Sequence, residues 1–139
     1  MQWIKARTLD TTQLAPMVFR ADHMAGVLQQ GDKSVLFLTF QNQPVSVDMK
    51  YSEMVPHVAN RIELHTPDGH AMSLNAHAIS VVDGDTGGKG RSRVVLGPLP
   101  LLVMEAVGEV YSNLVEACGD SETADPVPPG LVISNAGSV

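Results

Sequence analysis

The chain is poor in several kinds of residue. It has one cysteine, Cys118, so no disulfide can form within it, and only 4% of its residues are aromatic. Hydrophobic residues make up 44% of the chain and charged residues 17%, which is close to ordinary globular composition. No apolar run reaches the length needed to cross a bilayer. We therefore expect a globular protein with a largely aliphatic core, no membrane association and a place in the cytoplasm.

The charge is low and acidic. The formal net charge is −6, and residues 1–60 carry equal numbers of acidic and basic side chains. Asp120, Glu122 and Asp125 supply half of the net charge near the end of the chain. Affinity for a phosphate backbone needs a cluster of Lys and Arg, so nucleic acid is not expected as a partner.

The most informative pattern is an internal repeat. Residues Ile4 to Val58 align with Ile62 to Leu114 when short length differences are placed at turns, and apolar positions recur in the same order. Such a pattern predicts two copies of one supersecondary unit. The identical pairs are Ile4/Ile62, Thr8/Thr66, Asp10/Asp68, Ala21/Ala76, Val27/Val82, Ser34/Ser92, Leu38/Leu96, Val47/Val103 and Glu53/Glu109.

Local signals in the second unit predict strands followed by a helix. Residues 61–66 and 72–76 alternate in polarity around Pro67-Asp68-Gly69, which is typical of a hairpin turn. The apolar positions Ile79, Val81 and Val82 break the alternation and indicate a bulge or the end of strand pairing. Residues 101–117 have helical spacing that ends at Gly119, with Glu105, Glu109 and Glu116 expected to face water.

The first unit has similar signals. Residues 33–40 and 45–49 are predicted to form a hairpin, and a short helix with Pro56 in its first turn follows. Trp3 and Phe19 are expected to share one core on adjacent strands. We predict an α+β domain, residues 1–119, made of two similar β-rich units, about 3–58 and 61–117, each with antiparallel strands followed by a helix. An internal pseudo-two-fold is expected to relate the units, and the sheet is expected to be a closed or half-open barrel.

Residues 120–139 differ in composition. They are acidic and rich in Pro and Gly, which is typical of a flexible tail. The exception is an apolar run, Leu131, Val132 and Ile133, which is a candidate interaction segment because it could add as a strand to a sheet edge.

Catalytic and ligand-binding motifs are weak. Asp85-Thr86-Gly87 occurs in aspartic proteases, but there an apolar strand leads directly to the aspartate, whereas Gly84 intervenes here. The same loop lacks the first Gly and the Ser or Thr of a phosphate-binding loop. Lys89, Arg91 and Arg93 nevertheless form a basic, glycine-rich cluster that could bind an anion or a nucleotide.

The five histidines suggest metal binding only weakly. His65 and His70 flank the predicted turn, but they are out of register across it and therefore expected on opposite faces. We expect no metal and no cofactor, and no serine or cysteine lies in a nucleophile motif.

The sequence therefore favours a non-catalytic binding or protein-interaction module that associates with itself. Two alternatives stay open: a binder of small anionic ligands or nucleotides that uses residues 84–93, and an enzyme of unrecognised type.

Overall fold

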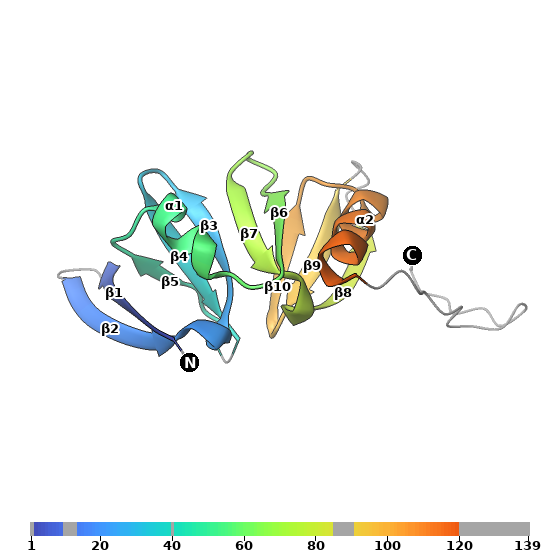
Figure 1. The fold of residues 1–139 in the computed structure, drawn as a ribbon. Coiled ribbons are helices and arrows are strands. Elements are labelled where there is room, and N and C mark those ends of the chain that lie inside the picture. The colour runs from blue at the N-terminus through green and yellow to red at the C-terminus, as the bar shows by residue number, and fades with distance from the viewer. Residues whose placement is uncertain (1, 10–13, 40, 85–90, 120–139) are drawn as a thin grey trace, which may run out of the picture.

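The computed structural model describes residues 2–9, 14–39, 41–84 and 91–119 (Figure 1). The first half contains five strands, a short helix and two 3₁₀ turns: β1 (Trp3–Leu9), β2 (Leu14–Arg20), Ala21–His23, β3 (Met24–Gln30), β4 (Lys33–Leu38), β5 (Val45–Val47), α1 (Tyr51–Met54) and Val55–His57. The second half contains five strands, one 3₁₀ turn and a helix: β6 (Arg61–His65), β7 (Ala71–Asn75), the 3₁₀ turn Ala76–Ala78, β8 (Ile79–Gly84), β9 (Ser92–Leu96), β10 (Leu99–Val103) and α2 (Val107–Cys118).

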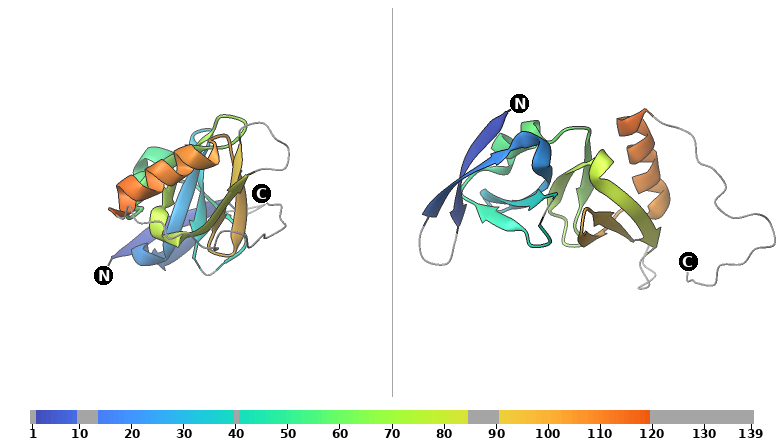
Figure 2. Two further views of the ribbon diagram at one scale, coloured as in Figure 1. Left: turned by 90° about the vertical axis from the view of Figure 1, so that its right-hand side faces the viewer. Right: turned by 90° about the horizontal axis from the view of Figure 1, so that it is seen from below.

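All the strand pairs of the described residues are antiparallel, as the hairpin signals predict. One sheet has the order β2-β1-β5-β4-β3-β7-β6, and the other has the order β10-β9-β8. The amide of Met104 donates to the carbonyl of His65 at 2.8 Å and so links the end of β10 to β6. The strands therefore follow one another in a row from β2, at one end of the molecule, to β8 and α2 at the other (Figures 1 and 2).

The turns predicted from Gly and Pro are confirmed. Gly69 has a φ of 92°, and its amide donates to the carbonyl of Thr66 at 2.8 Å, which closes the β6–β7 hairpin. The β4–β5 hairpin is also present, with Leu36 opposite Val45. The predicted irregularity in β8 is a register shift between Ile79 and Val81.

The predicted second helix is right at its end and wrong at its start. Gly119 ends α2 with a φ of 68°, and its amide donates to Val115. The helix begins at Val107, however, because Leu99–Val103 pairs with β9 as a strand. Glu105 precedes the helix and is buried at 7% exposure, contrary to the expectation that it faces water.

Two hydrophobic clusters share the β3–β4 hairpin. Val27 and Leu36 belong to the cluster of the first half, whereas Val35 and Phe37 belong to the cluster of the second half. The hairpin therefore has both faces buried, one against each half. Phe19 lies in the core as expected, but Trp3 is 60% exposed, because it is on the face of β1 that nothing covers in the described chain.

Two features of the predicted architecture are wrong. The described strands do not close into a barrel, since β2 and β8 have a neighbour on one side only. The expected pseudo-two-fold would require the pairing of β3 with β7 to be matched by a pairing of β8 with β2, but β8 and β2 lie at opposite ends of the strand row. The halves are thus joined through unlike edges. No helix in the described residues is long and apolar enough to cross a membrane.

Candidate functional site

The predicted anion-binding cluster is only partly within the described residues. Lys89 lies outside them, and so do Asp85-Thr86-Gly87. Arg93 makes two hydrogen bonds to Asp83, Nε to Oδ1 at 3.0 Å and Nη2 to Oδ2 at 2.6 Å. These bonds lower the pKa of the Asp83 carboxyl and raise the pKa of Arg93. The charge of Arg93 is therefore paired with a carboxylate on β8. Arg91, two residues earlier in the sequence, is half-buried.

The predicted interaction segment of Leu131, Val132 and Ile133 also lies outside the described residues. Neither predicted set of site residues therefore lies wholly within the described residues.

His65 has a structural partner. Its backbone amide donates to Glu105 Oε1 at 3.0 Å, and its ring Nδ1 lies 2.7 Å from Glu105 Oε2. The His65–Glu105 pair links β6 to the turn before α2. Among the residues that the structure describes, no three His, Cys, Asp or Glu side chains are grouped as they would be around a metal ion.

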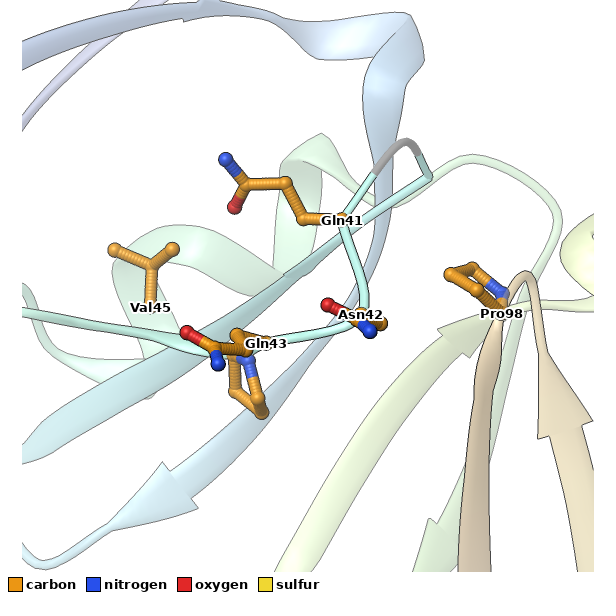
Figure 3. A pocket seen from close by; sticks show the side chains of 6 residues that line it. Gln41, Asn42, Gln43, Val45 and Pro98 are labelled. Atoms are coloured by element: carbon orange, nitrogen blue, oxygen red, sulfur yellow. The ribbon is translucent and has the colours of Figure 1, made fainter.

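One pocket lies where the two halves meet at the β4–β5 loop. It has a volume of about 500 Å³, and its described lining combines polar and apolar residues without a charged side chain (Figure 3). Asn42 of the first half and Pro98 of the second face each other across it. None of its described lining residues is a titratable group.

The strongest candidate site is an apolar surface at the end of the strand row where β2 lies beside β1. This surface is called the β2 edge. Val18 on β2 is 56% exposed, and Trp3 on β1 is 60% exposed. A pocket of about 270 Å³ is lined by residues of β1 and β2 and by Met49, which follows β5; Ala6, Met17 and Met49 are among its apolar lining residues. Lys5 and Arg7 also line this pocket. An apolar surface beside positive charge is suited to a protein partner.

The opposite end of the row, hereafter the β8 edge, consists of β8 and the first turns of α2. Val81 is 45% exposed, Val107 is 38% exposed and Tyr111 is 42% exposed. Glu109 on the same helix is also exposed. Of the seven large apolar side chains exposed in the described chain, five therefore lie on these two edges.

Periodicity could not identify these edges. Val18 lies beside buried Phe19 as in any half-buried strand, Val81 lies where β8 has no regular alternation, and only the strand order shows that no strand covers them.

The comparisons with known proteins provide no relative. No protein-family model matches the chain, no curated protein matches it, and no solved structure matches it. Any assignment of function therefore depends on the chain's own geometry.

Proposed function

We propose that this protein is a non-catalytic protein-interaction module that associates with itself through the β2 and β8 edges. The observation that carries this proposal is the position of five exposed apolar side chains, Trp3, Val18, Val81, Val107 and Tyr111, at the two ends of the strand row. Monomeric proteins seldom leave both the backbone groups and the apolar side chains of an edge strand uncovered, because such an edge is a template for pairing with another chain.

The proposal includes an architecture of two copies of one module, residues about 3–58 and 61–117, within a single domain. It is supported by hydrogen bonds that recur at aligned positions, so that each bond within the first half has a counterpart within the second half. The amide of Asp48 donates to Arg7 at 2.7 Å, and the amide of Met104 donates to His65 at 2.8 Å. The hydroxyl of Ser34 donates to the carbonyl of Met49, and that of Ser92 donates to the carbonyl of Glu105, both at 2.8 Å.

Strand register gives further support for duplication. Ile4 pairs with Phe19, and at the aligned positions Ile62 pairs with Leu74. The register shift between Met24 and Gly26 recurs at the aligned positions Ile79 and Val81. A bulge kept at one position in both halves is expected when two segments descend from one module.

The alternative of an anionic ligand or nucleotide at residues 84–93 has less support. Arg93 already binds Asp83, and a ligand would have to compete with that carboxylate. An enzymatic role has no support from the described side chains, and location in the cytoplasm remains a part of the proposal.

Sedimentation velocity of the full chain tests self-association directly. Over about two orders of magnitude of concentration, the weight-average sedimentation coefficient should rise as a larger species forms. The single tryptophan gives a second signal, because Trp3 is exposed in the isolated chain and should shift its emission to shorter wavelength when an interface covers it. A chain that remains monomeric throughout, with unchanged emission, would contradict the proposed function.

A further inference from the structure

The joint between the two halves is a template for the joint between two chains. Within the chain, β3 pairs with β7. In the alignment of the two halves, β3 corresponds to β8 and β7 corresponds to β2, and these two strands end the row. We infer that the β8 edge of one chain pairs with the β2 edge of the next, so that chains join head to tail through unlike edges. This inference rests on the proposed function.

The template fixes the register. At the internal joint, Gly26, Val27 and Leu28 lie opposite Leu74, Ser73 and Met72. The aligned residues are Val81, Val82 and Asp83 on β8, and Phe19, Val18 and Met17 on β2. The inferred pairs between chains are therefore Val81 with Phe19, Val82 with Val18, and Asp83 with Met17. Pro16, which has no N–H to donate, lies just before this segment.

Two side-chain contacts at the internal joint have aligned counterparts that are exposed and apolar. Tyr51 on α1 lies 2.6 Å from the hydroxyl of Ser73, and the aligned residues are Val107 and Val18. Arg61 donates to the carbonyl of Val55 at 2.8 Å, and the aligned residues are Trp3 and Tyr111. Polar contacts inside the chain are thus matched by apolar pairs, Val107 with Val18 and Trp3 with Tyr111, between chains.

The pocket at the β2 edge has a counterpart that the internal joint fills. Leu64 and Met72 are fully buried in one cluster with Val35 and Phe37 of the first half. The aligned residues of the first half, Ala6 and Met17, instead line the open pocket. In the head-to-tail joint, Arg93 and Val95 of the neighbouring chain take the places of Val35 and Phe37 and cover this pocket.

The second joint differs from the first in strength and in detail. A Cβ on Gly26 would lie 2.6 Å from Leu74 Cδ2 and 2.9 Å from the Ser73 carbonyl, so Val81 holds β8 further from β2 at that point. Asp83 and Arg93 replace Leu28 and Val35, which makes the joint more polar, and Asp83 meets the pocket that Lys5 and Arg7 line. The joint between chains is therefore reversible and weakens with salt.

A single head-to-tail contact leaves the β2 edge of one chain and the β8 edge of the other uncovered. Each added chain leaves one β2 edge and one β8 edge uncovered, so the assembly is a ring if the rotation per step closes, and an open chain if it does not.

The test uses two variants that each block one edge. Val18→Glu places a carboxylate on β2 opposite Lys5 of the same chain, and Val81→Glu places one on β8. Both positions are exposed, so each variant should keep the far-UV spectrum and unfolding temperature of the parent chain. We expect each variant alone to sediment as a monomer, and an equimolar mixture to form a one-to-one dimer with Trp3 emission shifted to shorter wavelength.

The outcomes separate this inference from the proposed function. If the parent chain associates but either variant alone still forms dimers, or the mixture stays monomeric, head-to-tail pairing is wrong while self-association stands. If the parent chain does not associate, both are wrong. Trp3→Ala and Tyr111→Ala form a second pair that should give the same pattern of monomers alone and a dimer in the mixture if a glutamate variant fails to fold.

Discussion

The phenolic hydroxyl of Tyr51 lies 2.6 Å from the hydroxyl of Ser73, and this contact joins helix α1 of the first half to strand β7 of the second. Ser73 is buried and Tyr51 is half-buried. Burial raises the pKa of the Tyr51 hydroxyl, which therefore stays protonated and able to donate. The halves are thus linked by side chains as well as by the strand pair.

Removal of this contact should weaken the joint by a measurable amount. Tyr51→Phe and Ser73→Ala should each lower the free energy of unfolding by about 1 kcal/mol, and the double variant by less than the sum. Urea denaturation of the four proteins gives this cycle. Ser52→Ala, at an exposed position on the same helix, is the control and should change stability little. Strictly additive effects would show that the two hydroxyls do not interact.

Gly26 should tolerate no side chain. Its Cβ would meet the Ser73 carbonyl at 2.9 Å, and a backbone atom within a paired strand cannot move aside easily. Gly26→Ala should cost about 1–3 kcal/mol of unfolding free energy. Gly108→Ala, in α2 where nothing lies within 4 Å, should be neutral or stabilise by up to about 1 kcal/mol. Equal thermal stability of the two variants would contradict the close approach of β3 and β7.

Glu105 should contribute far more to the free energy of unfolding than the exposed glutamates of α2. Glu105→Ala leaves the amide of His65 without its side-chain acceptor in a partly buried place and should cost about 1–3 kcal/mol. Glu105→Gln keeps one acceptor oxygen and should cost less. Glu116→Gln, at an exposed position, should stay within about 0.5 kcal/mol of the parent chain in chemical denaturation. A harmless Glu105→Ala would show that the link between β6 and the turn before α2 is unimportant.

Stability should fall in acid partly through Asp48. The hydrogen bond from Lys33 lowers the pKa of Asp48, and Arg7 lies 3.7 Å from its other oxygen. The unfolded chain, with an ordinary aspartate pKa of about 3.9, therefore binds this proton before the folded chain does. The stabilisation is complete above that value and is lost as the pH falls through the lowered folded pKa.

Asp48→Asn should reduce this acid dependence. Denaturation curves collected from neutral pH downward should fall less steeply for the variant, while Asp83, whose pKa is lowered by Arg93, keeps part of the slope. Parallel curves for the variant and the parent chain would show that the Lys33–Asp48 pair is not formed in solution.

Sequence reasoning succeeded where the signal is local. Gly69 and Gly119 determine a turn and a helix end through their own backbone angles, so neighbouring letters were enough to place them. It failed where distant partners decide. Val103 fits a helical period with Val107, yet it lies in β10 because β9 pairs with it. Glu105 is buried by a partner 40 residues away, and Trp3 is exposed because no strand covers that face of β1.

The candidate site was missed for the same reason. Lys89, a predicted ligand-binding residue, and the predicted interaction run Leu131 to Ile133 lie outside the described residues, whereas the edges depend on which strands have no neighbour. That property follows from strand order, which no local pattern contains. The proposed repeat adds part of this information, because it aligns β8 and β2 with the pair of strands that joins the halves.

A disulfide between chains tests head-to-tail pairing most directly. Val82 and Val18 are aligned with Val27 and Ser73, which are direct partners, and partner Cα atoms in antiparallel strands are about 4.5–5.5 Å apart, within the range of a disulfide. With Cys118 replaced by Ser, a Val18→Cys chain and a Val82→Cys chain should form a mixed disulfide in high yield when oxidised together, and neither should form one alone. Efficient Val18→Cys homodimers, or no mixed product, would contradict the account.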